Sequence, residues 1–439
     1  MTPEIGVRTG RAIVFYLREQ MKVDHPKIVI GRDTRISGPM LASAVMAGIC
    51  SMGGDAIDAG IIPTPGVSYL TRSEGAHAGI VISASHNPFQ DNGIKLFKGD
   101  GYKLSNAEEA ELEDLILDDE RQISAESIQN TGQIQVLNKS AERYTRFLQK
   151  TFKLSSECKM IKLVLDCSNG ATSGIARVLF ESLGFSVKAL FNQPNGKNIN
   201  AMCGSQHPEK MAEAVLEDQA DLGLAFDGDG DRLIAVDEKG HILSGDQIIA
   251  ICALYLNKHK QLRNKTVVST VMSNIGLGVA LQREGITHVM SDVGDRYVME
   301  EMLTNRAVIG GEDSGHIIFL DLHTTGDGML AALQLIQVML DAGKPLSKIA
   351  NVMTVFPQML LNVDVASKPD LTTIPEIQEI IQSVENELSS KGRVLVRYSG
   401  TQRMCRVMVE APTYDLAQTY CEQIAGVIAE KLGGESRSL

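Results

Sequence analysis

The sequence predicts an α/β protein: three similar α/β domains with mixed, mostly parallel sheets, followed by a C-terminal α+β domain. Two observations lead to this fold class. A strand–turn–helix–strand pattern occurs three times along the chain, and the last part of the chain breaks that pattern. In addition, 439 residues are too many for one hydrophobic core, because single cores stop growing beyond about 250–300 residues.

The three repeats share an apolar strand, a polar or glycine-bearing turn, a helix and a second strand. They are 27-KIVIGRDTRISGPMLASAVMAGICSMGGDAIDAG-60, 162-KLVLDCSNGATSGIARVLFESLGFSVKAL-190 and 266-TVVSTVMSNIGLGVALQREGITHVMS-291. This spacing is typical of parallel α/β units, in which active residues lie at the carboxyl ends of the strands. Before the first repeat, a helix is expected to begin near Thr2, with Pro3 in its first turn.

The C-terminal part predicts a smaller domain of mixed order. A strand at 359–365 precedes a helix, two strands and a last helix, at 374–390, 393–399, 405–411 and 414–433. The predicted domains span residues 1–135, 136–244, 245–352 and 353–439.

Composition argues against several classes of protein. The formal net charge of −12 disfavours general nucleic-acid binding, which needs a basic surface. No apolar run approaches the roughly 18 residues of a membrane span, and the N-terminus has no signal-peptide pattern. The seven cysteines are odd in number and include no CxxC pair, which is typical of reduced thiols. We therefore expect a cytoplasmic protein without nucleic-acid or membrane partners.

Three aspartates stand two residues apart in 225-AFDGDGDRLIAVDEKG-240, between two short apolar runs. Alternate residues of an extended segment face the same side, so Asp227, Asp229 and Asp231 can converge on one cation. Hard carboxylate oxygens, with room for a phosphate oxygen, suit magnesium. The stretch therefore predicts a magnesium site and, with it, phosphate chemistry.

Two other interpretations of this stretch are weaker. A calcium-binding EF-hand loop requires glycine at its sixth position, where this sequence has Arg232, and it requires flanking helices rather than strands. A solvated acidic hairpin would hold like charges together without a cation, which is electrostatically unfavourable.

A second polar stretch follows an apolar strand in 81-VISASHNPFQDNGIKLF-97. Ser85 would lie at the mouth of a parallel sheet, either as part of a structural turn or as a reactive group. The G-x-S-x-G motif of Ser-His-Asp hydrolases is absent. Next to a metal, however, the charge of a phosphorylated serine would be neutralised. Lys95 could then move a proton on or off a sugar hydroxyl if neighbouring positive charge lowered its pKa.

Two further loops carry hydrogen-bonding side chains. In 309-IGGEDSGHIIFLD-321, polar side chains on a glycine turn suit the vicinal hydroxyls of a sugar, although a buried ion pair would also fit. In 397-RYSGTQRMCR-406, backbone amides, two hydroxyls and several guanidinium groups form a candidate phosphate clamp. A plain basic hairpin is the alternative there.

Together the four stretches resemble the α-D-phosphohexomutase superfamily, in which four domains surround a central cleft and each contributes one loop. The phosphoserine, metal, sugar and phosphate loops of that family are matched in order by 83-SASHNP-88, 227-DGDGDR-232, 311-GEDSGH-316 and residues 397–401. The branch of the family that acts on glucosamine phosphates is resembled more closely than the phosphomannomutase/phosphoglucomutase branch. The stretches that carry this second resemblance are 203-CGSQHPE-209, 270-TVMSNIGLG-278 and 324-TTGDGMLAALQ-334.

The resemblance implies a role for each site residue. Ser85 would be the phosphoserine, and magnesium would bind to its phosphate and to the three aspartates. The remaining catalytic residues would be Lys95 and His316 as acid–base groups and Arg32 as support for the transferring phosphoryl group. The substrate-binding residues would be His86, Asn87, Arg232, Glu312, Ser314, Arg397, Ser399, Gly400, Thr401 and Arg406.

The implied reaction interconverts glucosamine 6-phosphate and glucosamine 1-phosphate, for UDP-N-acetylglucosamine and cell-wall precursor synthesis. Phosphorylated Ser85 would give its phosphoryl group to the sugar, and the resulting 1,6-bisphosphate would turn in the cleft and return its other phosphate. Magnesium is the implied cofactor, glucosamine (or glucose) 1,6-bisphosphate the activator, and a monomer or homodimer the expected assembly. The alternatives are a phosphomannomutase/phosphoglucomutase and a catalytically impaired homologue that binds sugar phosphates.

Three features depart from the family's pattern. Family members place the segment F-G-T-D-G-x-R-G on a strand ahead of the first helix, and this sequence does not contain it, so the first sheet is expected to lack its leading strand. The phosphate loop reads RYSGTQR where most relatives have RPSGTEP, and Tyr398 replaces a proline that would fix the turn. Asp313 stands where the glucosamine branch often has glutamine.

Overall fold

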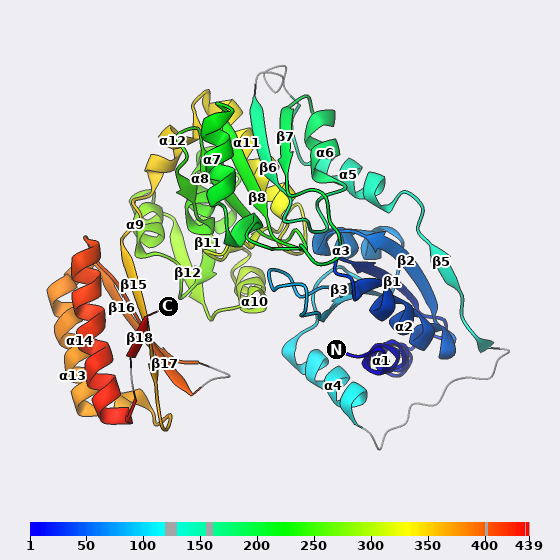
Figure 1. The fold of residues 1–439 in the computed structure, drawn as a ribbon, viewed down its shortest axis with the longest axis horizontal. Coiled ribbons are helices and arrows are strands. Elements are labelled where there is room, and N and C mark those ends of the chain that lie inside the picture. The colour runs from blue at the N-terminus through cyan, green and yellow to red at the C-terminus, as the bar shows by residue number, and fades with distance from the viewer. Residues whose placement is uncertain (119–129, 155–160, 400–402, 435, 439) are drawn as a thin grey trace. The chain divides into compact units, whose positions relative to one another are not determined.

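The computed structural model describes residues 1–118, 130–154, 161–399, 403–434 and 436–438 (Figure 1). Its contacts divide the chain into two compact units. The large unit comprises Met1–Met272 and Glu284–Val352, and the small unit comprises Ser273–Arg283 and Met353–Leu439.

The first sheet of the large unit consists of β1 (Lys27–Arg32), β2 (Asp55–Ile61), β3 (Ala78–Ile82), β4 (Ile94–Lys98) and β5 (Ile134–Val136). Their order across the sheet is β4-β3-β1-β2-β5, with β4 antiparallel to β3 and the other pairs parallel. Because β1 and β3 are parallel neighbours, the loops that follow them lie side by side at the carboxyl ends of the strands. The loop of Ser85 is the one that follows β3.

Helices cover both faces of the first sheet. They are α1 (Pro3–Met21), α2 (Gly38–Ser51), α3 (Thr64–Ser73) and α4 (Asn106–Leu117). One apolar core joins α1, α2 and α4 to Ile28, Ile30 and Ile80, while α3 packs against the opposite face (Figure 1). The predicted start of α1 is confirmed, since Thr2 Oγ1 accepts a hydrogen bond from the Ile5 amide at 3.5 Å.

The second sheet consists of β6 (Lys162–Asp166), β7 (Ser186–Leu190), β8 (Leu222–Phe226), β9 (Leu233–Asp237) and β10 (Ile242–Leu243), in the order β10-β9-β8-β6-β7. Strands β6, β7 and β8 are parallel, and β9 is antiparallel to both of its neighbours. Helix α5 (Ser140–Lys150) precedes the first strand of this sheet in the chain. Helices α6 (Ala176–Ser182) and α7 (Glu209–Glu217) connect its parallel strands. The three aspartates lie in the turn between β8 and β9.

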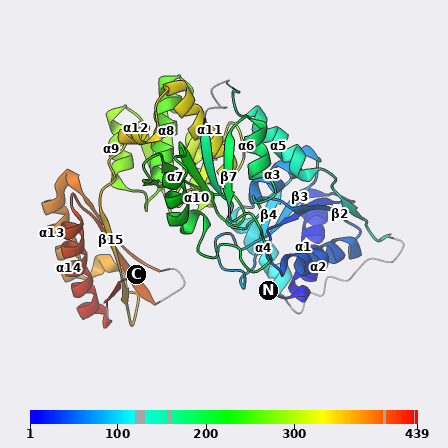
Figure 2. The same cartoon turned by 45° about the horizontal axis from the view of Figure 1, so that its top comes forward.

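The third sheet consists of β11 (Thr266–Thr270), β12 (Thr287–Ser291), β13 (Ile309–Gly311) and β14 (Ile317–Phe319), in the order β12-β11-β13-β14. Its helices are α8 (Gly245–Lys258), α10 (Asp295–Asn305), α11 (Gly328–Ala342) and α12 (Leu346–Ile349). Helix α10 packs on one face through Val298 and Met302, and α8 and α11 pack against one another at the other face (Figure 2).

Helix α9 (Ile275–Arg283), which connects β11 and β12, belongs to the small unit. The buried Glu410 carboxylate accepts hydrogen bonds from the Ile275 amide and from Arg393 Nε, both at 3.0 Å. Arg393 Nη2 also donates to the Ser273 carbonyl at 2.6 Å. These bonds tie the N-terminus of α9 to the C-terminal sheet.

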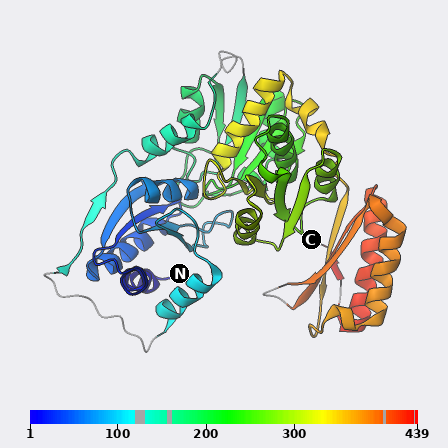
Figure 3. The ribbon, with the colours of Figure 1, turned by 180° about the vertical axis from the view of Figure 1, so that it is seen from behind.

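The small unit is built on β15 (Gln358–Asp364), β16 (Arg393–Tyr398), β17 (Met404–Glu410) and β18 (Ser436–Ser438), an antiparallel sheet in the order β16-β17-β15-β18. Helices α13 (Pro375–Leu388) and α14 (Tyr414–Leu432) lie side by side on one face (Figure 3). Strand β18 was not predicted. Short 3-10 helices lie at Gly204–Gln206, Arg263–Lys265, Ala350–Val352, Leu371–Thr373 and Ser389–Lys391.

The predicted fold class is confirmed: three mixed, mostly parallel α/β sheets and a C-terminal α+β domain. Each predicted repeat supplies two neighbouring parallel strands, namely β1 with β2, β6 with β7, and β11 with β12. The chain enters the first domain through α1, and the first strand of its sheet is β1. Six cysteines in the described ranges are buried free thiols. The described helices include none that is both long and apolar enough to cross a bilayer.

Candidate active site

Ser85 lies in the turn after β3 and has a φ of 50°, in the left-handed region that residues other than glycine seldom adopt. Its amide donates to Ser83 Oγ at 3.0 Å, and Ser83 Oγ in turn donates to Asp33 Oδ2 at 2.6 Å. Such a conformation costs on the order of 1–3 kcal/mol and persists where the surroundings over-determine it. These hydrogen bonds therefore hold Ser85 in its left-handed conformation.

The three aspartates converge as predicted, but they do so from the turn between β8 and β9 and not from an extended segment. One carboxylate oxygen from each of Asp227, Asp229 and Asp231 lies within 4.8 Å of the others, and all three side chains are buried. We call these residues the metal triad. Ser85 Oγ donates a hydrogen bond to Asp227 Oδ2 at 2.6 Å, so the serine hydroxyl faces the triad across the junction of the first two domains.

The donor set of the metal triad fits a hard divalent cation. Among the described residues, Asp229 Oδ1 and Asp231 Oδ1 are buried without a hydrogen-bond partner. Burial, and then the charges of its two neighbours, raise the pKa of Asp227 well above its ordinary value. Buried acceptors normally have partners, and clustered carboxylate oxygens are the ligands that magnesium accepts. The triad could therefore hold magnesium, with Ser85 at its edge.

Lys95, on β4, contacts the metal triad directly. Its Nζ lies 2.6 Å from Asp229 Oδ2 and 3.3 Å from Asp231 Oδ2. Burial would lower the pKa of Lys95, but these carboxylates outweigh burial and raise the pKa well above its ordinary value. The condition under which Lys95 could move a proton, a pKa lowered by neighbouring positive charge, is therefore not met here, because carboxylates surround the amine.

The loop between β13 and β14 brings His316 to the triad. Its Nδ1 lies 3.6 Å from Asp231 Oδ2, and its Nε2 lies 3.5 Å from an oxygen of Asp295, which also pairs with Lys103. Gly326 makes this position possible, because a Cβ there would lie 2.5–2.7 Å from the imidazole ring. The histidine thus sits in a slot with acidic groups at both nitrogens.

Glu312 and Ser314 occupy the same loop. Glu312 Oε1 accepts a hydrogen bond from the Gly294 amide at 3.1 Å. Ser314 Oγ is buried and has no partner within the described part of the chain. Arg232 follows the metal triad in sequence and forms an isolated β-bridge with His316. Its guanidinium interacts electrostatically with the Glu312 carboxylate. This cluster offers both donors and acceptors to a hydroxylated ligand.

Two of the predicted residues, Arg32 and Asn87, direct their side chains to partners in their own domain, whereas a third, His86, lies at the site. Arg32 Nη1 donates to Asp58 Oδ1 at 3.2 Å, within its own sheet. Asn87 Nδ2 donates to Asp91 Oδ2 at 3.1 Å, so its amide stabilises the loop. His86 does lie at the site, with Nδ1 3.5 Å from Ser85 Oγ.

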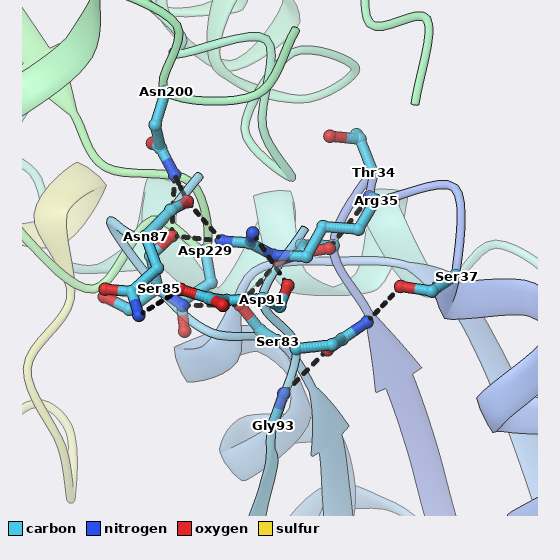
Figure 4. A network of polar contacts seen from close by, with 12 residues as sticks. Thr34, Arg35, Ser37, Ser83, Ser85, Asn87, Asp91, Gly93, Asn200 and Asp229 are labelled. Carbon is cyan, nitrogen blue, oxygen red and sulfur yellow. Dashed lines mark hydrogen bonds and ion pairs between the residues drawn. The ribbon is translucent and has the colours of Figure 1, made fainter. Parts of the chain in front are cut away.

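Sequence reasoning missed the residues that hold the serine loop in place. Figure 4 shows Arg35 and Asn200 reaching the same turn from two directions. Thr64, at the start of α3, donates its hydroxyl to Asp229 Oδ2. Arg35 stands in the first of the three repeats, residues 27–60, and Asn200 lies three residues before 203-CGSQHPE-209. Their positions were visible in the sequence, but their contacts were not.

The candidate phosphate clamp lies on the small unit. Arg397 and Arg406 face each other directly across β16 and β17, on the side of the sheet away from α13 and α14. The Ser399 amide donates to the Met404 carbonyl at 2.9 Å. Tyr398 donates its hydroxyl to the Pro369 carbonyl at 2.8 Å. Residues 400–402, which include the predicted Gly400 and Thr401, lie outside the described residues.

A serine hydroxyl directed at a buried carboxylate triad, on four domains of this order, defines a hexose-phosphate mutase of the phosphoglucomutase/phosphomannomutase family, and the chain belongs to that family. Its sequence matches the family's α/β/α domains I, II and III at residues 1–122, 142–240 and 244–356. The family's C-terminal domain matches at residues 360–427. The resemblance inferred from the sequence is confirmed.

Two relatives that match nearly the whole chain are both named phosphoglucosamine mutase. The chain is 54% identical to the phosphoglucosamine mutase of Syntrophus aciditrophicus, over 99% of this chain and 96% of that protein. It is 50% identical to the phosphoglucosamine mutase of Geobacillus thermodenitrificans, with the same coverage.

Two solved structures share the fold. A phosphoglucomutase/phosphomannomutase family protein from Burkholderia thailandensis has a TM-score of 0.81 at 23% identity, covering 99% of this chain and 95% of that one. The N-acetylphosphoglucosamine mutase of Aspergillus fumigatus, in complex with GlcNAc-6P and magnesium, has a TM-score of 0.65 at 18% identity, covering 84% of this chain and 92% of that one.

Proposed function

We propose that this chain is a phosphoglucosamine mutase, which interconverts glucosamine 6-phosphate and glucosamine 1-phosphate through phosphorylated Ser85 and a 1,6-bisphosphate. The observation that carries the phosphoryl-transfer chemistry is the 2.6 Å hydrogen bond from Ser85 Oγ to Asp227 of the metal triad. The preference for the amino sugar is supported by the names of the relatives that are 48–54% identical over nearly the whole chain.

In the forward reaction, the bond between phosphorus and Ser85 Oγ breaks while a bond forms between phosphorus and a sugar oxygen. Magnesium held by the metal triad would neutralise charge on the transferring phosphoryl group. Lys95, which keeps its proton beside Asp229 and Asp231, is suited to stabilise negative charge on the departing serine oxygen. The proton released by the sugar hydroxyl passes to a base of the site, and His316 is the candidate.

The sugar and its second phosphate need their own contacts. Ser314 Oγ, buried and unpartnered among the described residues, and the Glu312 carboxylate beside Arg232 offer hydrogen bonds to ring hydroxyls. Arg397, Arg406 and the loop that follows β16 would hold the phosphate that is not being transferred. The same clamp must accept either phosphate of the 1,6-bisphosphate, so it should recognise the dianion rather than the sugar.

The test is phosphorus NMR of the purified chain with magnesium, a trace of glucose 1,6-bisphosphate and one hexose 6-phosphate at a time. Glucosamine 1-phosphate should appear faster than glucose or mannose 1-phosphate. The Ser85→Ala variant should abolish turnover of each sugar, while Ser43→Ala, at an exposed serine of α2, should leave it unchanged. Faster turnover of mannose or glucose phosphates would indicate a phosphomannomutase/phosphoglucomutase instead. Absence of any turnover would indicate an impaired homologue.

A further inference from the structure

Asn200 comes from the second domain and reaches into the serine loop of the first. Its Nδ2 donates to the Ser85 carbonyl at 2.8 Å and to the Asn87 carbonyl at 2.9 Å (Figure 4). An amide nitrogen has two hydrogens, so both are used on this one turn. The Asn200 backbone is itself left-handed, with φ of 57°, and its amide donates to the Ser168 carbonyl at 2.9 Å.

Arg35, which is buried, reaches the same two carbonyls from the other side. Its Nη2 donates to the Ser85 and Asn87 carbonyls, both at 2.9 Å. A carbonyl oxygen has two lone pairs. The two carbonyls of the turn are therefore each saturated by one arginine hydrogen and one asparagine hydrogen. We call this arrangement the carbonyl clamp.

The metal loop closes against the carbonyl clamp. A Cβ at Gly228 would lie 2.6 Å from the Ser85 carbonyl oxygen and 2.8 Å from Asn200 Nδ2. The residue between Asp227 and Asp229 therefore packs directly on the bonds that hold Ser85. A shift of the serine carbonyl would change the distance between Ser85 Oγ and the metal triad.

We propose that Asn200 is a positioning residue for phosphoryl transfer: by donating to both carbonyls, it holds Ser85 in its left-handed conformation with Oγ directed at the metal triad. This inference rests on the proposed function. Asn200 does not contact the reacting oxygen, so it acts through the placement of Ser85. Because it comes from a different domain from the serine, it also fixes the serine loop of the first domain to the domain that carries the triad.

The experiment compares Asn200→Ala, Asn200→Asp and the matched control Asn198→Ala. Asn198 lies in the same loop, and its side-chain amide donates to the Gln193 carbonyl within that loop. Aspartate has the shape of asparagine but no hydrogens to donate. Steady-state kcat and KM for glucosamine 6-phosphate, together with the melting temperature, are measured for each variant and for the unaltered chain.

If the hydrogen bonds donated by Asn200 position Ser85, kcat should decrease about 30-fold in Asn200→Ala and at least as much in Asn200→Asp, because even a small misplacement of a reacting group slows the reaction. KM should stay within about twofold, because the sugar is not touched. The control should match the unaltered chain. If Asn200→Asp keeps full kcat, or if KM rises while kcat is unchanged, the positioning role is overturned.

A second measurement keeps this test separate from that of the proposed function. The second measurement is the rate of amide hydrogen exchange in peptides covering residues 84–92, which can be measured whether or not the protein turns over substrate. If the unaltered chain turns over no hexose phosphate, the proposed function fails, but faster exchange of these peptides in both Asn200 variants than in Asn198→Ala would still support the clamp. Equal exchange in all variants would overturn it.

Discussion

Replacing Arg35 with methionine should remove the most heavily bonded cation of the site. Arg35 Nε donates to Asp33 Oδ2 at 2.8 Å, both side chains are fully buried, and the guanidinium also bonds the Pro88 and Asp91 carbonyls. Breaking a buried ion pair by removing one partner costs about 3–5 kcal/mol, because the other charge stays buried. A loss of that size should lower the melting temperature of the large unit by roughly 4–7 °C.

The loss should depend on pH. Burial already raises the pKa of Asp33, and Arg35 opposes that rise. Without Arg35 the pKa of Asp33 rises further, so the folded variant holds a proton that the unfolded chain releases. Stability of the variant therefore falls as pH rises through that window. The gap in melting temperature between Arg35→Met and the unaltered chain should be larger at about pH 8 than at about pH 5.

Two controls bound this result. Arg177, whose exposed guanidinium pairs with Glu181 at 2.7 Å, should tolerate methionine with a change of about 0–1 kcal/mol. The double variant Asp33→Asn with Arg35→Met should recover part of the loss, because no charge remains unpaired. The measurement is thermal unfolding followed by circular dichroism across pH. Equal melting temperatures for Arg35→Met and Arg177→Met would refute the claim that the buried bonds of Arg35 stabilise the loop of Ser85.

Three further predictions concern the metal, the histidine slot and a buried carboxyl. Replacing one aspartate of the metal triad with asparagine should weaken magnesium binding by at least about tenfold in calorimetry, and unchanged affinity would argue against a metal site there. Gly326→Ala should lower kcat about 10- to 100-fold by displacing His316, whereas Gly174→Ala, with open space around it, should not. Tyr144→Phe removes the 2.7 Å hydrogen bond to Asp327, whose pKa burial raises to about 6. The variant should lose about 1–3 kcal/mol above that pH and less below it, because a protonated carboxyl is cheaper to bury; a loss of stability that is the same on both sides of that pH would contradict this.

The order of secondary structure followed from local patterns. Each repeat has strand and helix signals that do not depend on distant residues, and the strands predicted at 27, 162 and 266 begin at those residues in β1, β6 and β11. The sequence pattern did not predict that α9 packs with the small unit. That placement depends on hydrogen bonds to Arg393 and Glu410, which lie more than 100 residues further along the chain. Strand β18 was missed for a similar reason: its pairing with β15 is a long-range contact.

The sequence by itself determined which polar groups meet at the candidate site. The spacing of the three aspartates predicted that their carboxylates meet, although they meet from the turn between β8 and β9 rather than from an extended segment. The strand before Ser85 likewise predicted that its hydroxyl lies at the carboxyl end of a sheet strand. The tertiary structure alone decided their electrostatic surroundings. Lys95 meets carboxylates rather than cations because β4 runs back beside the turn that follows β8. Arg35 and Asn200, which are 50 and 115 residues from Ser85 in sequence, hold the strained serine because their loops converge on two carbonyl oxygens of the serine loop. Hydrogen-bond partners depend on that convergence, and no local pattern encodes it.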